Sequence, residues 1–165
     1  PNVYNGAELW DMTLVDPDNR QRVDFALRRR LLQECGAGAA PEAIWARQET
    51  GLPKLFLLQR ALELRRERAA AFGAGERGNY RPLHAQGVYA EKVLAFARGE
   101  EVVTVVPRLT LSVADWPRAA ADTWLELPSG RWRDRLSGET HRGRAAVSDL
   151  LARFPVALLA REATA

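Results

Sequence analysis

The feature that most constrains the fold of this 165-residue chain is a change of pattern near residues 74–78. Before it, apolar residues recur at helical spacing. After it come short segments rich in β-branched and aromatic residues, with turn residues between them. The intervening Ala74-Gly75-Glu76-Arg77-Gly78 has the small and charged residues of a linker. We therefore expect an α+β fold in two parts, residues 1–73 and 78–165.

Three helices are expected in the first part. Apolar residues recur every four positions from Val23 to Cys35, which predicts an amphipathic helix closed by Gly36. Pro41 suits the start of a short helix that carries Ile44 and Trp45 inward until Gly51. Pro53 opens the strongest helix, which ends by Gly73. Its broad apolar face, expected to pack on a sheet or barrel, contains Leu55, Leu58, Ala61 and Leu62.

The second part reads as an antiparallel β-sandwich. Gly99-Glu100-Glu101 predicts a hairpin, and Ser129-Gly130 and Ser137-Gly138 predict two more tight turns. Pro155 is expected to separate a short helical turn from a final buried strand. The other predicted strands are Asn79 to Leu83, Val88 to Arg98, Val102 to Pro107, Leu109 to Val113, Thr123 to Leu127 and Trp132 to Leu136.

Composition excludes several functional classes. The 24 Lys and Arg residues are interleaved with 21 acids, so the net charge of +3 predicts a solvated surface and no nucleic-acid partner. Cys35 has no partner for an internal disulfide, and His84 and His141 lack zinc spacing, so no metal and no cofactor are expected. The apolar runs are too short for a membrane span and no signal peptide is seen, which predicts no membrane partner and a cytoplasmic location.

Polar residues gather in the opening segment around Asp16-Pro17-Asp18-Asn19-Arg20, near Tyr4 and Trp10. Carboxylates, an amide and a guanidinium can pair with sugar hydroxyls, while aromatic rings stack on the apolar faces of a sugar. The alternative for Asp16 to Arg20 is an Asx-type turn with Arg20 in a surface ion pair. Because Val3-Tyr4 resembles the end of a buried strand and no initiator Met precedes it, we expect the chain to be a piece of a longer protein.

Three further residues near this segment carry weaker expectations. Glu8 and Asp11 could contact a ligand, but a loop anchor that accepts backbone N–H bonds is favoured for both. Lys54, one of two lysines in the chain, is expected to snorkel at the start of the long helix. Trp10 and Tyr4 could stack on a sugar, although an aromatic residue beside a strand end is more often in the core.

A series of motifs occurs in an order that resembles a known family. The series contains PNVYNGAELWDMTLVDPDNR at 1–20, GLPKL at 51–55, GNYRPL at 78–83, VLAFARG at 93–99, VVTVVPRL at 102–109 and LLARFPVALL at 150–159. It is similar to the C-terminal end of the maltooligosyl trehalose synthase family, in the α-amylase superfamily. Asn5, Ala7 and Gln21 depart from that pattern, where Gln, Thr and Arg are usual.

The resemblance implies that residues 1–73 complete a TIM-type β/α barrel and that 78–165 form the C-terminal β-sandwich. The loop from Glu8 to Arg20 would then lie on the catalytic face of the barrel. It would supply Asp16, Asp18, Asn19, Arg20 and Glu8 as substrate-binding residues.

The resemblance also implies an activity and its partners. The family isomerises the reducing-end α-1,4 bond of a maltooligosaccharide to an α,α-1,1 bond, by intramolecular transglycosylation through a covalent glycosyl intermediate. Its catalytic carboxylates lie on earlier barrel strands, so no catalytic residue is expected in this chain. The expected partners are the maltooligosaccharide substrate and the rest of the barrel.

An alternative from another functional class is an autonomous carbohydrate-binding module. Trp116, Trp124 and Trp132 fall on or near predicted strands and could form a platform for a sugar. A buried sandwich core would explain the same three residues.

Overall fold

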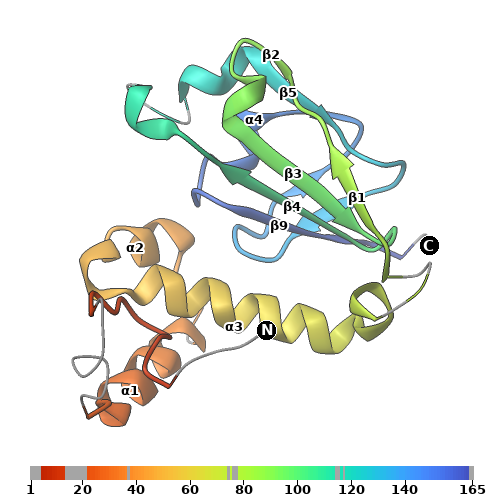
Figure 1. The fold of residues 1–165 in the computed structure, drawn as a ribbon. Coiled ribbons are helices and arrows are strands. Elements are labelled where there is room, and N and C mark those ends of the chain that lie inside the picture. Colours follow the sequence, from red (N-terminus) through yellow and green to blue (C-terminus); the bar gives the residue numbers. More distant parts are fainter. Residues whose placement is uncertain are drawn as a thin grey trace. The chain divides into compact units, whose positions relative to one another are not determined.

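The computed structural model describes residues 5–13, 22–36, 38–73, 75, 78–113, 116 and 118–163. The chain divides into two compact units, residues 1–60 and 61–165. Helices come first along the chain and antiparallel sheets follow (Figure 1). The predicted α+β class is therefore confirmed, whereas the predicted domain bounds, 1–73 and 78–165, stay a prediction.

The first helix, α1 (Phe25–Gly36), is amphipathic as predicted. Leu31 and Cys35, one helical turn apart, are buried. The Asp24 carboxylate accepts the backbone N–H of Leu27 at 2.8 Å, which satisfies one of the free donors that every helix start leaves.

The second helix, α2 (Pro41–Trp45), is shorter than predicted. A 3₁₀ turn at Gln48–Thr50 replaces its expected second half, before Gly51 takes up a left-handed conformation with φ 76°. Ile44 is buried as expected, but Trp45 is exposed, so its predicted inward orientation is wrong. Successive helical residues point about 100° apart, and Ile44 already occupies the buried side.

The long helix, α3 (Leu52–Glu67), begins with Pro53 in its first turn, where a missing N–H costs nothing. Leu52, Leu55 and Phe56 are buried at helical spacing. Leu62 is exposed, so the predicted apolar face is narrower than expected. Within the described residues, no helix combines the length and apolarity that crossing a membrane requires.

The second unit contains two antiparallel sheets. One has six strands in the order β1-β3-β4-β9-β6-β7, and the other has three in the order β2-β5-β8. The strands are β1 (Tyr80–Leu83), β2 (Gln86–Gly87), β3 (Val93–Arg98), β4 (Val102–Pro107), β5 (Thr123–Glu126), β6 (Trp132–Asp134), β7 (Thr140–His141), β8 (Arg144–Ala146) and β9 (Ala157–Arg161).

Two of the predicted strand segments need correction. The segment 109–113 forms a 3₁₀ turn, Thr110–Ser112, because Pro107 cannot donate a ladder hydrogen bond and Leu109 turns the chain with φ 53°. The segment 88–98 is extended only over β3, after a 3₁₀ turn at Ala90–Lys92.

The three predicted turns occur where expected. Two of them lie in hairpins of the large sheet, and the third joins the two sheets. Residues 99–101 join β3 to β4, and residues 137–138 lie in the hairpin of β6 and β7. Residues 129–130 instead lead from β5 in the small sheet to β6 in the large one. Pro155 separates helix α4 (Val147–Leu150) from β9, as predicted, and β9 pairs with β4 and β6 inside the large sheet.

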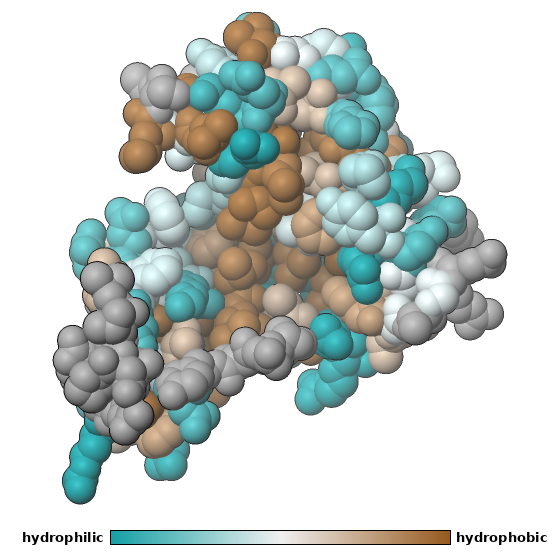
Figure 2. Space-filling model, viewed as in Figure 1, coloured by the Kyte–Doolittle hydropathy of each residue, from teal (hydrophilic) through white to brown (hydrophobic). Residues whose placement is uncertain are grey.

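Alternate residues from both sheets build the core of this unit. Val103, Leu125 and Leu159 come from β4, β5 and β9 and are fully buried together with Trp132 of β6. Helix α4 adds Leu150 to the same cluster. Apolar atoms also reach the surface (Figure 2), and the large exposed side chains of this unit include Tyr80, Val88, Leu94, Leu109 and Leu111.

Candidate functional site

Arg28 of α1 clamps the start of the described opening segment, residues 5–13. Its guanidinium Nε donates to the Glu8 carboxylate at 3.1 Å, and its Nη2 donates to the Gly6 carbonyl at 2.5 Å. Both side chains of the ion pair are partly buried, with exposed fractions of 17% for Arg28 and 27% for Glu8. Gly6 has φ 96°, a conformation that favours glycine. Glu8 therefore anchors the opening segment to α1 through its ion pair with Arg28. Its predicted contact with sugar stays a prediction.

A second set of contacts holds Leu9 and Trp10 against the start of α3. The Lys54 ammonium donates to the Leu9 carbonyl at 3.0 Å and lies 5.5 Å from the centroid of the Trp10 ring. The indole N–H of Trp10 donates to the Gln48 carbonyl at 2.5 Å. Trp10 is half exposed, so it is not the core residue that its position favoured.

Gly51 allows the two backbones to meet. A Cβ at this position would lie 2.7 Å from the Trp10 backbone nitrogen and 3.1 Å from the Leu9 Cα. Its φ of 76° adds a second reason for glycine. A larger residue would force one of the two backbones to shift.

Asp11 and Thr13 close the described part of the segment. The Asp11 carboxylate accepts the Thr13 backbone N–H at 3.0 Å and its hydroxyl at 2.5 Å, as expected of a loop anchor. These bonds from Thr13, the hydroxyl first, lower the pKa of Asp11 below its ordinary value. Asp11 is therefore an ionised, locally bonded group at physiological pH.

The four central residues predicted to bind substrate, Asp16, Asp18, Asn19 and Arg20, lie outside the described residues, as does Tyr4. Of the predicted site, the structure describes Glu8. Sequence reasoning did not identify the anchors Arg28 and Lys54, because their partners are 20 and 45 positions away in the chain. The rarity of lysine was the one available signal for Lys54.

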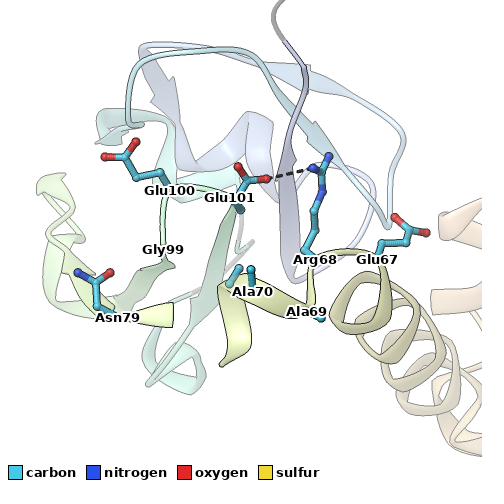
Figure 3. A pocket seen from close by; sticks show the side chains of 9 residues that line it. Glu67, Arg68, Ala69, Ala70, Asn79, Gly99, Glu100 and Glu101 are labelled. Carbon is cyan, nitrogen blue, oxygen red and sulfur yellow. Dashed lines mark ion pairs between the residues drawn. The ribbon is translucent and has the colours of Figure 1, made fainter. Parts of the chain in front are cut away.

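The second unit has a cavity of about 640 Å³ beside the β3–β4 hairpin. Residues 69–71, all alanine, line it together with Asn79 and residues 99–101 (Figure 3). Arg68 and Glu101 form an ion pair of 3.1 Å there, drawn as a dashed line in Figure 3. Arg68 also donates to the Arg161 carbonyl at 3.2 Å.

The other carboxylates at this cavity are likewise held by arginines. Glu67 pairs with Arg135 at 2.8 Å and Glu100 with Arg161 at 3.3 Å. Each pair links different elements, so the charges connect the end of α3, the hairpin and the sheet. The described contacts favour a structural ion-pair network over a site of glycosidic chemistry.

The burial of the three tryptophans favours packing in the core over an exposed platform, the two alternatives that the sequence left open. Trp132 is fully buried and donates its indole N–H to the Pro128 carbonyl at 2.7 Å. The Arg144 guanidinium lies 3.8 Å from the centroid of the Trp124 ring. Trp116 packs against the core.

The described acid whose pKa is raised, Asp134, lies in the interior of the β-rich unit. A retaining glycosidase uses a carboxylate nucleophile and, about 5 Å away, a carboxylic acid of raised pKa. The described carboxyl with a raised pKa is Asp134, where burial opposes the charged form. It is 1% exposed and bonded to backbone amides, out of reach of a substrate. The described residues also contain no group of three or more His, Cys, Asp or Glu side chains placed to hold a metal ion.

Comparison with known proteins gives a consistent relationship. A Mycobacterium tuberculosis protein provisionally named maltooligosyl trehalose synthase is 40% identical over 164 residues, which cover 98% of this chain and 19% of that protein. The solved maltooligosyltrehalose synthase of Arthrobacter ramosus has a TM-score of 0.83 and 40% identity, over 97% of this chain and 20% of that one. A hypothetical maltooligosyl trehalose synthase of Sulfolobus tokodaii has a TM-score of 0.58 and 26% identity, over 93% of this chain and 17% of its own.

No protein-family model matches the chain. The chain spans about a fifth of the length of the relatives that it matches, 19% of the Mycobacterium protein and 20% of the Arthrobacter one. The matches cover nearly all of this chain, 98% of it in the sequence comparison and 97% in the structural one. The chain is therefore similar, over nearly its whole length, to a C-terminal portion of the maltooligosyl trehalose synthases.

Proposed function

We propose that this chain is the C-terminal portion of a maltooligosyl trehalose synthase and supplies a substrate-positioning segment and a scaffold to it. The observation that carries the proposal is 40% identity over 98% of the chain, together with a TM-score of 0.83 to the Arthrobacter enzyme. In this proposal residues 1–73 complete the catalytic β/α barrel and residues 78–165 form a supporting β-sandwich. The cytoplasmic location stays a prediction.

The proposed reaction moves a glucose without consuming water. A carboxylic acid elsewhere in the protein protonates O4 of the reducing-end glucose as the terminal α-1,4 bond breaks. A carboxylate bonds to the anomeric carbon of the remaining oligosaccharide, which gives a covalent intermediate. The released glucose then attacks through its anomeric oxygen, whose proton returns to the same acid–base group. The product has an α,α-1,1 linkage and no reducing end. Because substrate and product have the same atoms, the reaction is an isomerisation.

The opening segment would hold the donor sugar during these steps. Asp16, Asp18, Asn19 and Arg20 are the proposed contacts to glucose hydroxyls, and Glu8 supports them through its ion pair with Arg28. Positioning of this kind keeps the glucose near the intermediate and water away from it.

Exposed apolar residues of the β-rich unit support contact with the rest of the proposed enzyme. Tyr80 and Leu94 lie on β1 and β3 and are about half exposed, at 55% and 43%. Tyr80 also stacks on Phe96, with ring centroids 5.1 Å apart. Such surfaces usually mark contacts with other protein parts.

The test is the fate of the reducing end of maltopentaose. The full-length protein should remove reducing ends while it releases little free glucose, because the new linkage joins two anomeric carbons. The 165-residue chain alone should leave maltopentaose unchanged. Release of glucose or maltose with a rise in reducing ends would assign a hydrolase, and product from the chain alone would place catalysis in it.

A further inference from the structure

Lys54 directs its charge at the opening segment. It lies in the first turn of α3, where snorkelling was expected, yet its ammonium donates to the Leu9 carbonyl at 3.0 Å. The same ammonium faces the Trp10 ring at 5.5 Å. The Lys54 side chain is partly buried, which strengthens both interactions relative to a fully solvated pair.

Residues around Lys54 hold Leu9 and Trp10 from the other side. The Gln48 carbonyl accepts the Trp10 indole N–H at 2.5 Å, and Gly51 leaves room for the Trp10 backbone. Leu9 itself is buried at 5% exposure. Lys54 thus completes a clamp that fixes two adjacent residues of the segment at both backbone and side chain.

The clamp lies just before the proposed substrate contacts. Leu9 precedes Asp16 by seven positions, and the Asp11–Thr13 turn occupies part of that interval. Loss of the clamp would free the Leu9 backbone, which precedes the proposed contacts in the sequence. A displacement of about 1 Å in a positioning element can lower the rate about a hundredfold.

We propose that Lys54 is a positioning residue that fixes the described opening segment, residues 5–13, through the Leu9 carbonyl and the Trp10 ring, and thereby supports substrate positioning in the proposed enzyme. This inference rests on the proposed function. Lys54 acts through the segment and makes no contact with sugar. Its role needs a cation that donates at the end of a long side chain, which distinguishes it from a packing role of the aliphatic stem.

The experiment compares three variants of the full-length protein. Lys54→Met keeps the stem and removes the charge, and Lys54→Arg keeps a cationic donor. Lys92→Met is a matched control, because Lys92 also donates to a carbonyl, that of Leu109 at 3.2 Å, in the other unit. Two quantities are measured: kcat and KM on maltopentaose, and hydrogen–deuterium exchange of peptides that cover residues 9–13.

We expect Lys54→Met to lower kcat about tenfold or more, to raise the share of free glucose among products, and to accelerate exchange in residues 9–13. Lys54→Arg should recover part of each change, and Lys92→Met should alter none of them. Unchanged exchange, unchanged kcat, or an equal effect of Lys92→Met overturns the positioning role. A wild-type protein that leaves maltopentaose unconverted refutes the proposed function, while the exchange data still decide whether Lys54 holds the segment.

Discussion

Asp134 offers a sharp test of how the β-rich unit is held together. Its Oδ1 accepts the backbone N–H groups of Leu136 and Leu158, each at 3.0 Å. Its Oδ2 accepts the Ser137 hydroxyl at 2.7 Å and the Ser137 N–H at 3.3 Å. One buried carboxylate thus joins the β6–β7 hairpin to β9.

The expected loss of folding stability depends on the hydrogen-bond donors that lose their acceptor when Asp134 is replaced. Asp134→Ala leaves the Leu136 and Leu158 amides without this acceptor, at about 1–3 kcal/mol each, so we expect a loss of roughly 2–6 kcal/mol. Asp134→Asn retains Oδ1 and both amide contacts. It loses the bond from the Ser137 N–H, because the amide Nδ2 donates and cannot accept, and it should cost about 1 kcal/mol. Asn is thus the matched control for loss of charge without loss of the acceptor.

The pH dependence of the Asn variant gives an independent check. Burial raises the pKa of Asp134 above its ordinary value, so the folded protein keeps the proton at pH values where the unfolded chain has lost it. The contribution of Asp134 to stability therefore falls as pH rises from the ordinary pKa of 3.8 to the raised one, and stays low above it. The cost of Asp134→Asn should accordingly be largest near pH 4 and smaller at pH 7.

The assay is urea denaturation of the 165-residue chain at several pH values, with hydrogen exchange of the Leu136 and Leu158 amides. Equal stability of the Ala and Asn variants would show that the loss of an acceptor for the Leu136 and Leu158 amides does not destabilise the fold, which contradicts the prediction. A cost of Asp134→Asn that grows with rising pH would refute the account of the buried charge.

Two further predictions concern the clamp on the opening segment, with urea denaturation as the measurement for both. Gly51→Ala should cost about 1–3 kcal/mol, because a Cβ meets the Trp10 backbone and the left-handed conformation strains alanine; Gly38→Ala, at φ 74° with open space around it, is the control for strain alone. Equal losses would contradict the close approach. Arg28→Ala should lower the free energy of unfolding more than Glu8→Ala, because Arg28 also donates to the Gly6 carbonyl. The double-mutant cycle should give a coupling energy of about 1 kcal/mol between Arg28 and Glu8. Zero coupling would show that this ion pair does not stabilise the fold.

Local signals predicted the fold well where neighbouring residues decide the outcome. The spacing of Leu31 and Cys35 indicated α1, and residues 99–101 indicated the β3–β4 hairpin, because these patterns depend on contacts within one element or turn. The strand predicted at 109–113 is absent because Pro107 ends the ladder and Leu109 turns the chain with φ 53°.

The candidate site was harder to predict because its anchors are distant in sequence. Lys54 reaches Leu9 across 45 positions, and Arg28 reaches Glu8 across 20. Neither pairing leaves a periodic pattern in the sequence. Asp16 to Arg20 were identified by residue type and by resemblance, and their role stays a prediction.

The central claim is that the opening segment positions substrate for catalytic groups that lie elsewhere in the protein. Its most direct test is kcat/KM for conversion of maltopentaose by the full-length protein with Asp16→Ala, beside a thermal unfolding curve of the same sample. The account predicts a fall of about tenfold to a hundredfold with an unchanged melting temperature. Wild-type kcat/KM in a folded Asp16→Ala protein would contradict it.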